Sequence, residues 1–198
     1  PPKDLYKDGL QRDLFVPFIT IMEKNQDILE LDIGLDYRLN RLNSMDVYLT
    51  PADTNANSKL DANFKELSIG ATASSVSLYV KERKIKIPWA AEGVAMATFF
   101  DLCKQPLGPS DYLEIASCFH TLILKNIPKL GPENRNEAKR FVTLIDTLYE
   151  AKVNLICSAE VPPHMLYTEG DEAFEFNRTV SRLIEMQSTE YHAMAHVS

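Results

Sequence analysis

The sequence of 198 residues lacks the short motifs that mark most self-contained enzyme sites. It has only seven glycines, and it contains neither a GxxxxGK[ST] phosphate loop nor a GxGxxG motif. A GxSxG nucleophile elbow is absent as well. The three cysteines (Cys103, Cys118 and Cys157) lie far apart, and the four histidines form no HExxH motif. We therefore expect neither a disulfide framework nor a structural metal site.

Basic charge and long hydrophobic runs are also scarce. Lys and Arg total 21 against 28 for Asp and Glu, a net charge of -7 that argues against a nucleic-acid-binding function. No run approaches the roughly 18–20 apolar residues that span a bilayer, so at most peripheral membrane association is expected. The composition, 45% hydrophobic and 25% charged, is that of a globular protein. The first residue is Pro1 rather than Met, which suggests a start within a longer reading frame.

The first third of the chain mixes periodic segments with polar ones. Apolar residues at helical spacing predict a helix over Gly9–Asn25, and alternation over Asp27–Ile33 predicts a half-buried strand. Residues 37–48 are mixed and are expected to pair with that strand. The polar, turn-rich stretch Thr50–Ser58 precedes a short helix at residues 60–67.

A β-hairpin is predicted next, with strands at residues 76–80 and 85–87. Its turn, Lys81–Lys84, is strongly basic. A solvated turn is the simplest interpretation, because turn tips are normally polar. Contact with a partner or with nucleic acid is the alternative.

From residue 94 onward, strand patterns and helix patterns alternate. The alternation predicts strands at 94–98, 121–124 and 153–157, and helices at 110–118, 133–151 and 171–195. Ser110 is the expected cap of the first of these helices. Strands that alternate with helices indicate βαβ units, so the predicted fold is α/β with a mainly parallel sheet.

A short pattern near the start of the chain recurs near its end. The opening Pro-Pro-x-x-Leu-Tyr-x-x-Gly of residues 1–9 reappears at residues 162–170. The second copy follows the predicted strand at 153–157, so by analogy a strand would precede the first copy. An internal duplication, similar turn chemistry or chance would explain the echo.

Four arginines are candidate binding residues, because Arg suits bidentate contacts with phosphate or carboxylate. Arg12 lies in the first predicted helix, and Arg38 follows the predicted strand at residues 27–33. Arg178 and Arg182 are four residues apart on the last helix and share a face. Surface ion pairs are the alternative, since Glu175 lies close to Arg178 in the sequence and Glu185 lies close to Arg182.

Seven segments together resemble the AFG-like P-loop ATPases, which include bacterial ZapE and mitochondrial Lace proteins. They occur in the family's order and are Pro1–Ile19, Leu35–Leu39, Phe100–Leu113, Phe119–Leu124, Glu137–Asp146, Cys157–Pro163 and Phe174–Tyr191. The resemblance runs from residue 1 to about 191, and only residues 50–85 lack a distinctive match. It implies the C-terminal part of a P-loop, AAA-like ATPase with a β-hairpin insertion.

The resemblance also implies an organisation and a chemistry. Residues 1–49 would be the tail of the ATPase core, 50–93 a linker or insertion with the hairpin, and 94–198 a C-terminal α/β lobe. ATP with Mg would be bound mainly by residues upstream of this chain, so the chain alone should not hydrolyse ATP. Arg12, in the family's Gly-Leu-Gln-Arg motif, would reach the γ-phosphate held by a neighbouring subunit. Arg38, Arg178 and Arg182 would sense the nucleotide or clamp the C-terminal lobe to the ATPase core.

The leading hypothesis is therefore an oligomeric ATPase that remodels a protein client. By resemblance to ZapE, the candidate client is the tubulin-like filament of the bacterial division ring, and the expected compartment is the cytoplasm. A mitochondrial protein is the alternative implied by the Lace branch. The rival hypothesis is a non-catalytic α/β module at residues 94–198 that binds a protein. Cys103, in the family's Asp-Leu-Cys motif, is expected to be a buried structural thiol.

Overall fold

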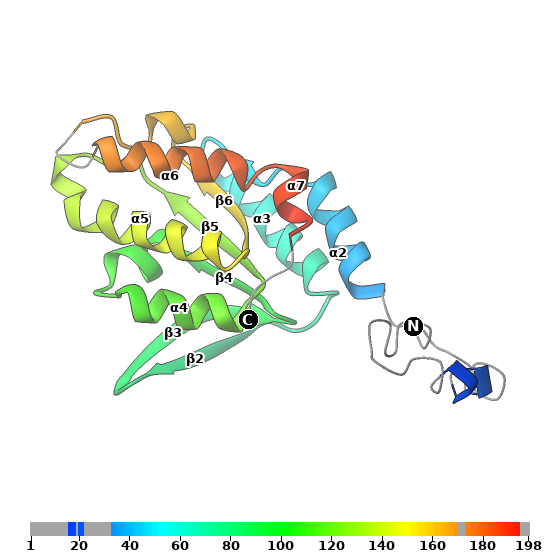
Figure 1. Ribbon diagram of the computed structural model, residues 1–198. Coiled ribbons are helices and arrows are strands. Elements are labelled where there is room, and N and C mark those ends of the chain that lie inside the picture. The colour runs from blue at the N-terminus through cyan, green and yellow to red at the C-terminus, as the bar shows by residue number, and fades with distance from the viewer. Residues whose placement is uncertain (1–15, 19, 22–32, 170–172, 195–198) are drawn as a thin grey trace. The chain divides into compact units, whose positions relative to one another are not determined.

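The computed structural model divides the chain into two compact units, residues 1–37 and 38–198. The structure describes residues 16–18, 20–21, 33–169 and 173–194 (Figure 1). In the first unit the described residues of the predicted helix over 9–25 are helical. The predicted strand at 27–33 lies outside the described residues, except for Ile33, which begins a helix. The second unit contains the β-sheet and the helices that cover it.

The second unit is built on a six-stranded sheet in the order β1-β6-β5-β4-β3-β2. Its strands are β1 (Tyr48–Leu49), β2 (Ser74–Val80), β3 (Arg83–Ala91), β4 (Val94–Thr98), β5 (Thr121–Ile127) and β6 (Asn154–Ala159). The strands β1, β6, β5 and β4 run parallel, whereas β3 and β2 add in antiparallel fashion at one edge. The predicted α/β fold with a mainly parallel sheet is thus confirmed.

Helices cover both faces of this sheet (Figure 1). One face packs against α4 (Pro109–Cys118), α5 (Arg135–Glu150) and α6 (Ala173–Glu185), and the other packs against α3 (Thr54–Leu67). Side chains of β5 alternate between the two faces, with Leu122 and Leu124 toward α4 and α5 and Ile123 toward α3. Both faces of the central strands are therefore buried, as in other parallel sheets.

Most predicted elements of residues 54–159 are confirmed. The β2–β3 hairpin turns at Lys81 and Glu82, and α3 buries Leu60, Phe64 and Leu67 on one face. A π-helix, η2 (Phe100–Lys104), and two 3₁₀ helices, η3 (Pro132–Asn134) and η4 (Pro163–Met165), complete the connections. Within the described residues, no helix has the length and apolar character needed to cross a membrane.

Two local expectations were wrong. The segment 37–48 is not extended throughout, because α2 (Ile33–Ser44) is helical; Leu35, Leu39 and Leu42 recur at helical spacing, and Leu42 is buried. Ser110 does not cap α4. Gly108 is the capping residue, and its backbone N–H donates to the buried Asp111 carboxylate at 2.8 Å. Pro109 at the first helical position fixes the helix start one residue earlier than predicted.

The predicted C-terminal helix is divided into α6 and α7 (Thr189–His192). Ser188 interrupts it, because its hydroxyl accepts a hydrogen bond from the Tyr191 backbone N–H at 3.1 Å and caps α7. The turn directs the buried Tyr191 hydroxyl at the Val153 carbonyl oxygen, 3.2 Å away. This hydrogen bond joins α7 to Val153, the residue directly before β6.

Residues 50–93, which the sequence suggests as a linker or insertion, lie within the same core. Their helix α3 covers one face of the sheet, and β2 and β3 extend the sheet beyond β4. The echo of the opening motif at 162–170 follows β6 as expected and includes η4, and its Leu166 and Tyr167 are buried in the core. The first copy, at residues 1–9, lies outside the described residues.

Candidate functional site

The first candidate region is the edge of the sheet at which the parallel strands end. In α/β proteins, ligands bind beyond the carboxyl ends of the parallel strands. Because β1, β6, β5 and β4 run parallel, their carboxyl ends share an edge. The connection from β1 to α3 at this edge is a strand–loop–helix unit, the arrangement in which phosphate loops bind nucleotides.

This strand–loop–helix unit does not fit a phosphate group. The loop Thr50–Asp53 has neither glycine nor lysine. The Asp53 carboxylate accepts a hydrogen bond from the Ala56 backbone N–H at 2.8 Å, and so it occupies the start of α3 with negative charge. The hollow beside it holds about 210 Å³, below the roughly 300–1,000 Å³ of ligand pockets. The strand–loop–helix unit of residues 48–67 therefore lacks the features of a phosphate site within the α/β unit of residues 38–198, which is called the described lobe below.

A polar cluster also occupies the carboxyl edge. The ammonium of the buried Lys125, near the end of β5, lies 2.5 Å from the Asp61 carboxylate of α3. The next residue, Asn126, has a positive φ of 60°, and its backbone N–H donates to the Ser158 hydroxyl at 2.9 Å. These contacts tie α3, β5 and β6 together. No group of three or more His, Cys, Asp or Glu side chains able to hold a metal occurs among the described residues.

The structure brings Arg178 and Arg182 together at the interface between α6 and α5. Both guanidinium groups form ion pairs with Asp146 of α5. Arg182 also pairs with Glu150 at 2.7 Å, and its guanidinium lies 4.7 Å from the centroid of the Tyr149 ring. The carboxylate partners therefore come from α5, not from Glu175 or Glu185 on the same helix.

The other two predicted arginines are not placed by the structure. Arg12 lies outside the described residues, and Arg38 lies in α2 with a side chain outside the description. Their expected nucleotide contacts stay predictions. The same holds for Arg178 and Arg182, whose guanidinium groups are engaged by the carboxylates of α5. The pairs join α6 to α5 within residues 94–198, so a clamp between this lobe and residues 1–49 stays a prediction as well.

The pairing of α6 with α5 predicts a measurable coupling between Arg182 and Asp146. In a double-mutant cycle with Arg182→Ala and Asp146→Ala, we expect a coupling of about 1 kcal/mol in the free energy of unfolding, because both side chains are largely buried. Urea denaturation without nucleotide measures it. A cycle of Asp146→Ala with Lys139→Ala, two turns away on α5, is the control and should be additive. Additivity in the first cycle would mean that this ion pair does not help to hold α6 against α5.

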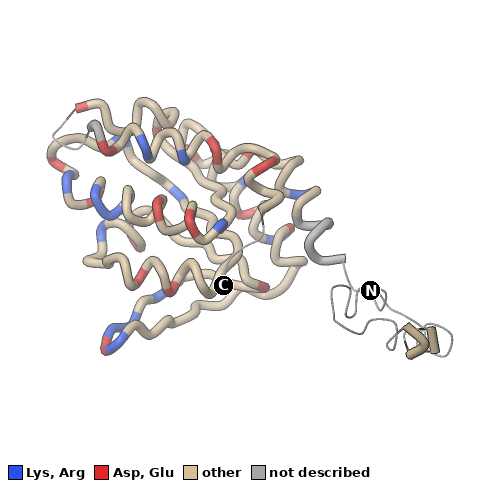
Figure 2. The backbone as a smooth tube through the Cα atoms, in the orientation of Figure 1, with Lys and Arg blue, Asp and Glu red and all other residues tan. Residues whose placement is uncertain are grey.

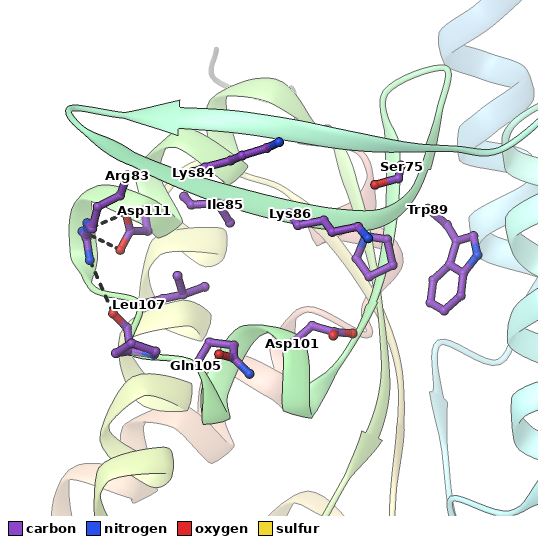
Figure 3. A pocket seen from close by; sticks show the side chains of 12 residues that line it. Ser75, Arg83, Lys84, Ile85, Lys86, Trp89, Asp101, Gln105, Leu107 and Asp111 are labelled. Carbon is purple, nitrogen blue, oxygen red and sulfur yellow. Dashed lines mark hydrogen bonds and ion pairs between the residues drawn. The ribbon is translucent and has the colours of Figure 1, made fainter.

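A groove lies at the part of the sheet away from β1, between β3 and the η2–α4 connection (Figure 3). Its volume is about 720 Å³. Arg83 crosses one end, where its guanidinium donates to the Asp111 carboxylate at 2.8–2.9 Å. Lys84, Lys86 and Trp89 line the β3 side. The sequence showed the basic turn but not the groove, because the second wall comes from residues about 20 positions later.

The cysteines take no part in these sites. Cys103, Cys118 and Cys157 are all free thiols. Cys103 is fully buried, and burial raises the pKa of its thiol, as it also does for Cys157. A thiol with a raised pKa is a poor nucleophile at neutral pH. The prediction that Cys103 is a buried structural thiol is confirmed.

Comparison with known proteins places the chain in a family. A family model described as "AFG1-like ATPase" matches residues 1–195. The chain is 34% identical over its whole length to "Cell division protein ZapE" of Escherichia coli K12, of which it covers 53%. It is 35% identical over 96% of its length to "Lactation elevated protein 1 homolog B" of Danio rerio, of which it covers 45%. No solved structure matches the chain.

The chain thus spans about half the length of the curated relatives it matches. An "Uncharacterized protein C115.02c" of Schizosaccharomyces pombe extends the pattern, at 33% identity over 96% of this chain and 48% of the relative. The described sheet is consistent with a P-loop ATPase-like fold. Given a family match over nearly every residue, the chain belongs to the AFG1-like ATPases.

Proposed function

We propose that the complete protein hydrolyses ATP and uses the turnover to remodel a protein client. The family match over residues 1–195 carries this proposal. The described lobe offers neither a phosphate loop nor a fitting strand–loop–helix unit. Mg-bound ATP is therefore held, in this proposal, by parts of the complete protein outside the lobe, in the half of the relatives' length that the chain does not span.

Arg12 is the residue through which this chain would take part in hydrolysis. It lies in Gly9-Leu10-Gln11-Arg12, the segment that resembles the family's arginine motif. An arginine supplied from a neighbouring subunit stabilises the negative charge that develops on the transferred phosphoryl group. Such a site is complete only between two subunits, so the proposal includes a homo-oligomer.

The client and the compartment follow from the bacterial relative. That protein is named a cell division protein, and by analogy we propose a cytoplasmic protein whose client is the tubulin-like division filament. The described lobe would be the part that binds the client. The capping of α3 by Asp53 supports this assignment of client binding to the lobe and ATP binding to the rest of the protein. With the Asp53 carboxylate at its start, the strand–loop–helix unit of the lobe does not suit a phosphate group.

Steady-state ATP turnover tests the proposal directly. The complete protein is expected to hydrolyse ATP in the presence of Mg²⁺, and the 198-residue chain alone is expected to show no turnover above buffer. The chain should be checked for folding by circular dichroism, so that inactivity is not misassigned. An inactive complete protein would contradict the proposed ATPase function, and an active isolated chain would contradict the placement of the nucleotide outside the lobe.

A further inference from the structure

The strand β3 has an open edge that the sheet does not use. It spans nine residues, whereas β4 spans five, and the two strands pair only from Trp89 to Ala91. The N-terminal part of β3, residues 84–88, therefore extends past its neighbour. In the described structure no strand pairs with this part of β3 on the side away from β2. An unpaired strand edge is a template for an added strand.

The register decides which backbone groups point to the open edge. The two-residue turn Lys81–Glu82 makes Val80 and Arg83 a hydrogen-bonded pair, and such pairs alternate along an antiparallel ladder. The backbone groups of Ile85 and Ile87 therefore face β2, and those of Lys84 and Lys86 face the open edge. The register shifts beyond Ile87, so β3 pairs with β4 only after this irregularity.

The open edge has room for an extended chain. The groove of about 720 Å³ runs along it, with Gln105, Pro106 and Leu107 on the facing wall. Figure 3 shows Arg83 at one end, Trp89 at the other and Lys86 between them. Trp89 is 42% exposed, which is unusual for a residue with so much apolar surface.

The charged side chains that line the groove determine which kind of ligand it favours. Figure 2 shows basic residues gathered on the β2–β3 hairpin of this acidic chain. Arg83 is neutralised by Asp111, and the Asp101 carboxylate accepts two hydrogen bonds from Thr98. Lys84 and Lys86 are exposed, and within the described residues their ammonium groups have no ion-pair partner. Beyond the Arg83–Asp111 pair, the lining has two lysines and one carboxylate, Asp101, which leaves a net positive charge. The groove is therefore complementary to carboxylates, and it repels the same edge of a second copy.

We infer that the open edge of β3 binds an extended acidic segment of a protein partner as an added strand. Backbone pairing with Lys84 and Lys86 supplies the register, and their ammonium groups attract alternate carboxylates of the segment. The exposed ring of Trp89 covers an apolar side chain of the same segment. The inference deepens the proposed client-binding role of the lobe and rests on it for its biological meaning, although the groove itself does not need ATP.

Trp89 is the only tryptophan of the chain and lines this groove, so its emission responds to binding there. It also lines a second hollow beside Phe64 and Lys125, and the lysine variants below distinguish the two. The probe is an eight-residue peptide of alternating glutamate and valine, titrated into the full chain without nucleotide. We expect a saturable blue shift of the emission. The Lys84→Glu and Lys86→Glu double variant should bind about tenfold more weakly or worse. A double variant with Lys129→Glu and Lys139→Glu has the same charge change on distant exposed sites and should bind as the unchanged chain does.

Two further probes separate the alternatives. A peptide with N-methyl groups on alternate residues cannot pair along one edge, and it should lose binding if the segment adds as a strand. A single-stranded oligothymidine tests a nucleic-acid site, and tighter binding of it than of the peptide would overturn the inference. So would an unshifted Trp89 emission, or equal affinity of the Lys84 and Lys86 double variant. Because ATP is absent, failure here is distinct from failure of the proposed ATPase function.

Discussion

Arg12→Ala in the complete protein is expected to lower ATP turnover about a thousandfold or more, with little change in ATP affinity. The reason is that an arginine supplied by a neighbouring subunit acts on the charge of the transition state, and such residues contribute about 10³–10⁵ to the rate. In the proposed mechanism, binding of the ground state relies on a phosphate loop and a metal outside this chain instead. Steady-state turnover and nucleotide binding, measured on the same oligomeric preparation, separate the two effects.

Arg41→Ala is the matched control for this experiment. Arg41 is an arginine of α2 whose guanidinium pairs with Glu66 within the lobe. Its loss should leave turnover within about twofold of the unchanged protein. If Arg12→Ala also stayed within about twofold, the role of Arg12 in completing a neighbour's site would be refuted.

Phe141→Ala should cost about 3–5 kcal/mol in the free energy of unfolding, the usual range for a fully buried aromatic residue. The Phe141 side chain is 0% exposed and lies between two other rings. Its centroid is 5.9 Å from that of Phe99 and 6.1 Å from that of Phe176. The three rings join the end of β4, α5 and α6. Loss of the Phe141 ring would therefore also loosen the helix that carries Arg178 and Arg182. Urea denaturation of the chain measures the loss.

The neighbouring Phe100 provides the comparison. Its side chain is 57% exposed, so Phe100→Ala should stay within about 0.5 kcal/mol of the unchanged chain. Phe141→Leu keeps most of the apolar volume and should cost less than Phe141→Ala. A loss below about 1 kcal/mol for Phe141→Ala would mean that α5 and α6 are not held by this core.

The elements with strong periodicity could be predicted from the sequence. Helix α5 has Phe141, Val142, Ile145 and Leu148 at helical spacing, and all four are buried. The hairpin and the three central parallel strands also followed from alternation or from short apolar runs. These segments obey local rules, because each buries one stripe or both faces of a regular element.

Pairings distant in the sequence could not be predicted. The nearest acidic residues to Arg178 along the chain are on its own helix, yet its partner is Asp146 on α5. The short strand β1 carries no periodic signal, and it joins the sheet through β6, more than 100 residues later. Rules based on local propensity give no information about contacts between residues that are distant in the sequence.

The groove also could not be predicted, and the physical reason is a different one. It exists because β3 is longer than β4 and changes register beyond Ile87. The basic turn at Lys81–Lys84 was visible in the sequence, but a solvated turn was its simplest interpretation. Only the pairing of β3 with β4 shows that Lys84 and Lys86 border an unpaired edge.

The site shared between subunits is the central claim, and a mixing experiment tests it most directly. One variant of the complete protein carries Arg12→Ala, and a second keeps Arg12 but cannot bind ATP. Each alone is expected to be inactive. In mixed oligomers the second variant supplies Arg12 to nucleotide bound by the first, so a measurable fraction of the unchanged protein's turnover should return. A mixture as inactive as its components, with mixed oligomers shown to form, would contradict the account.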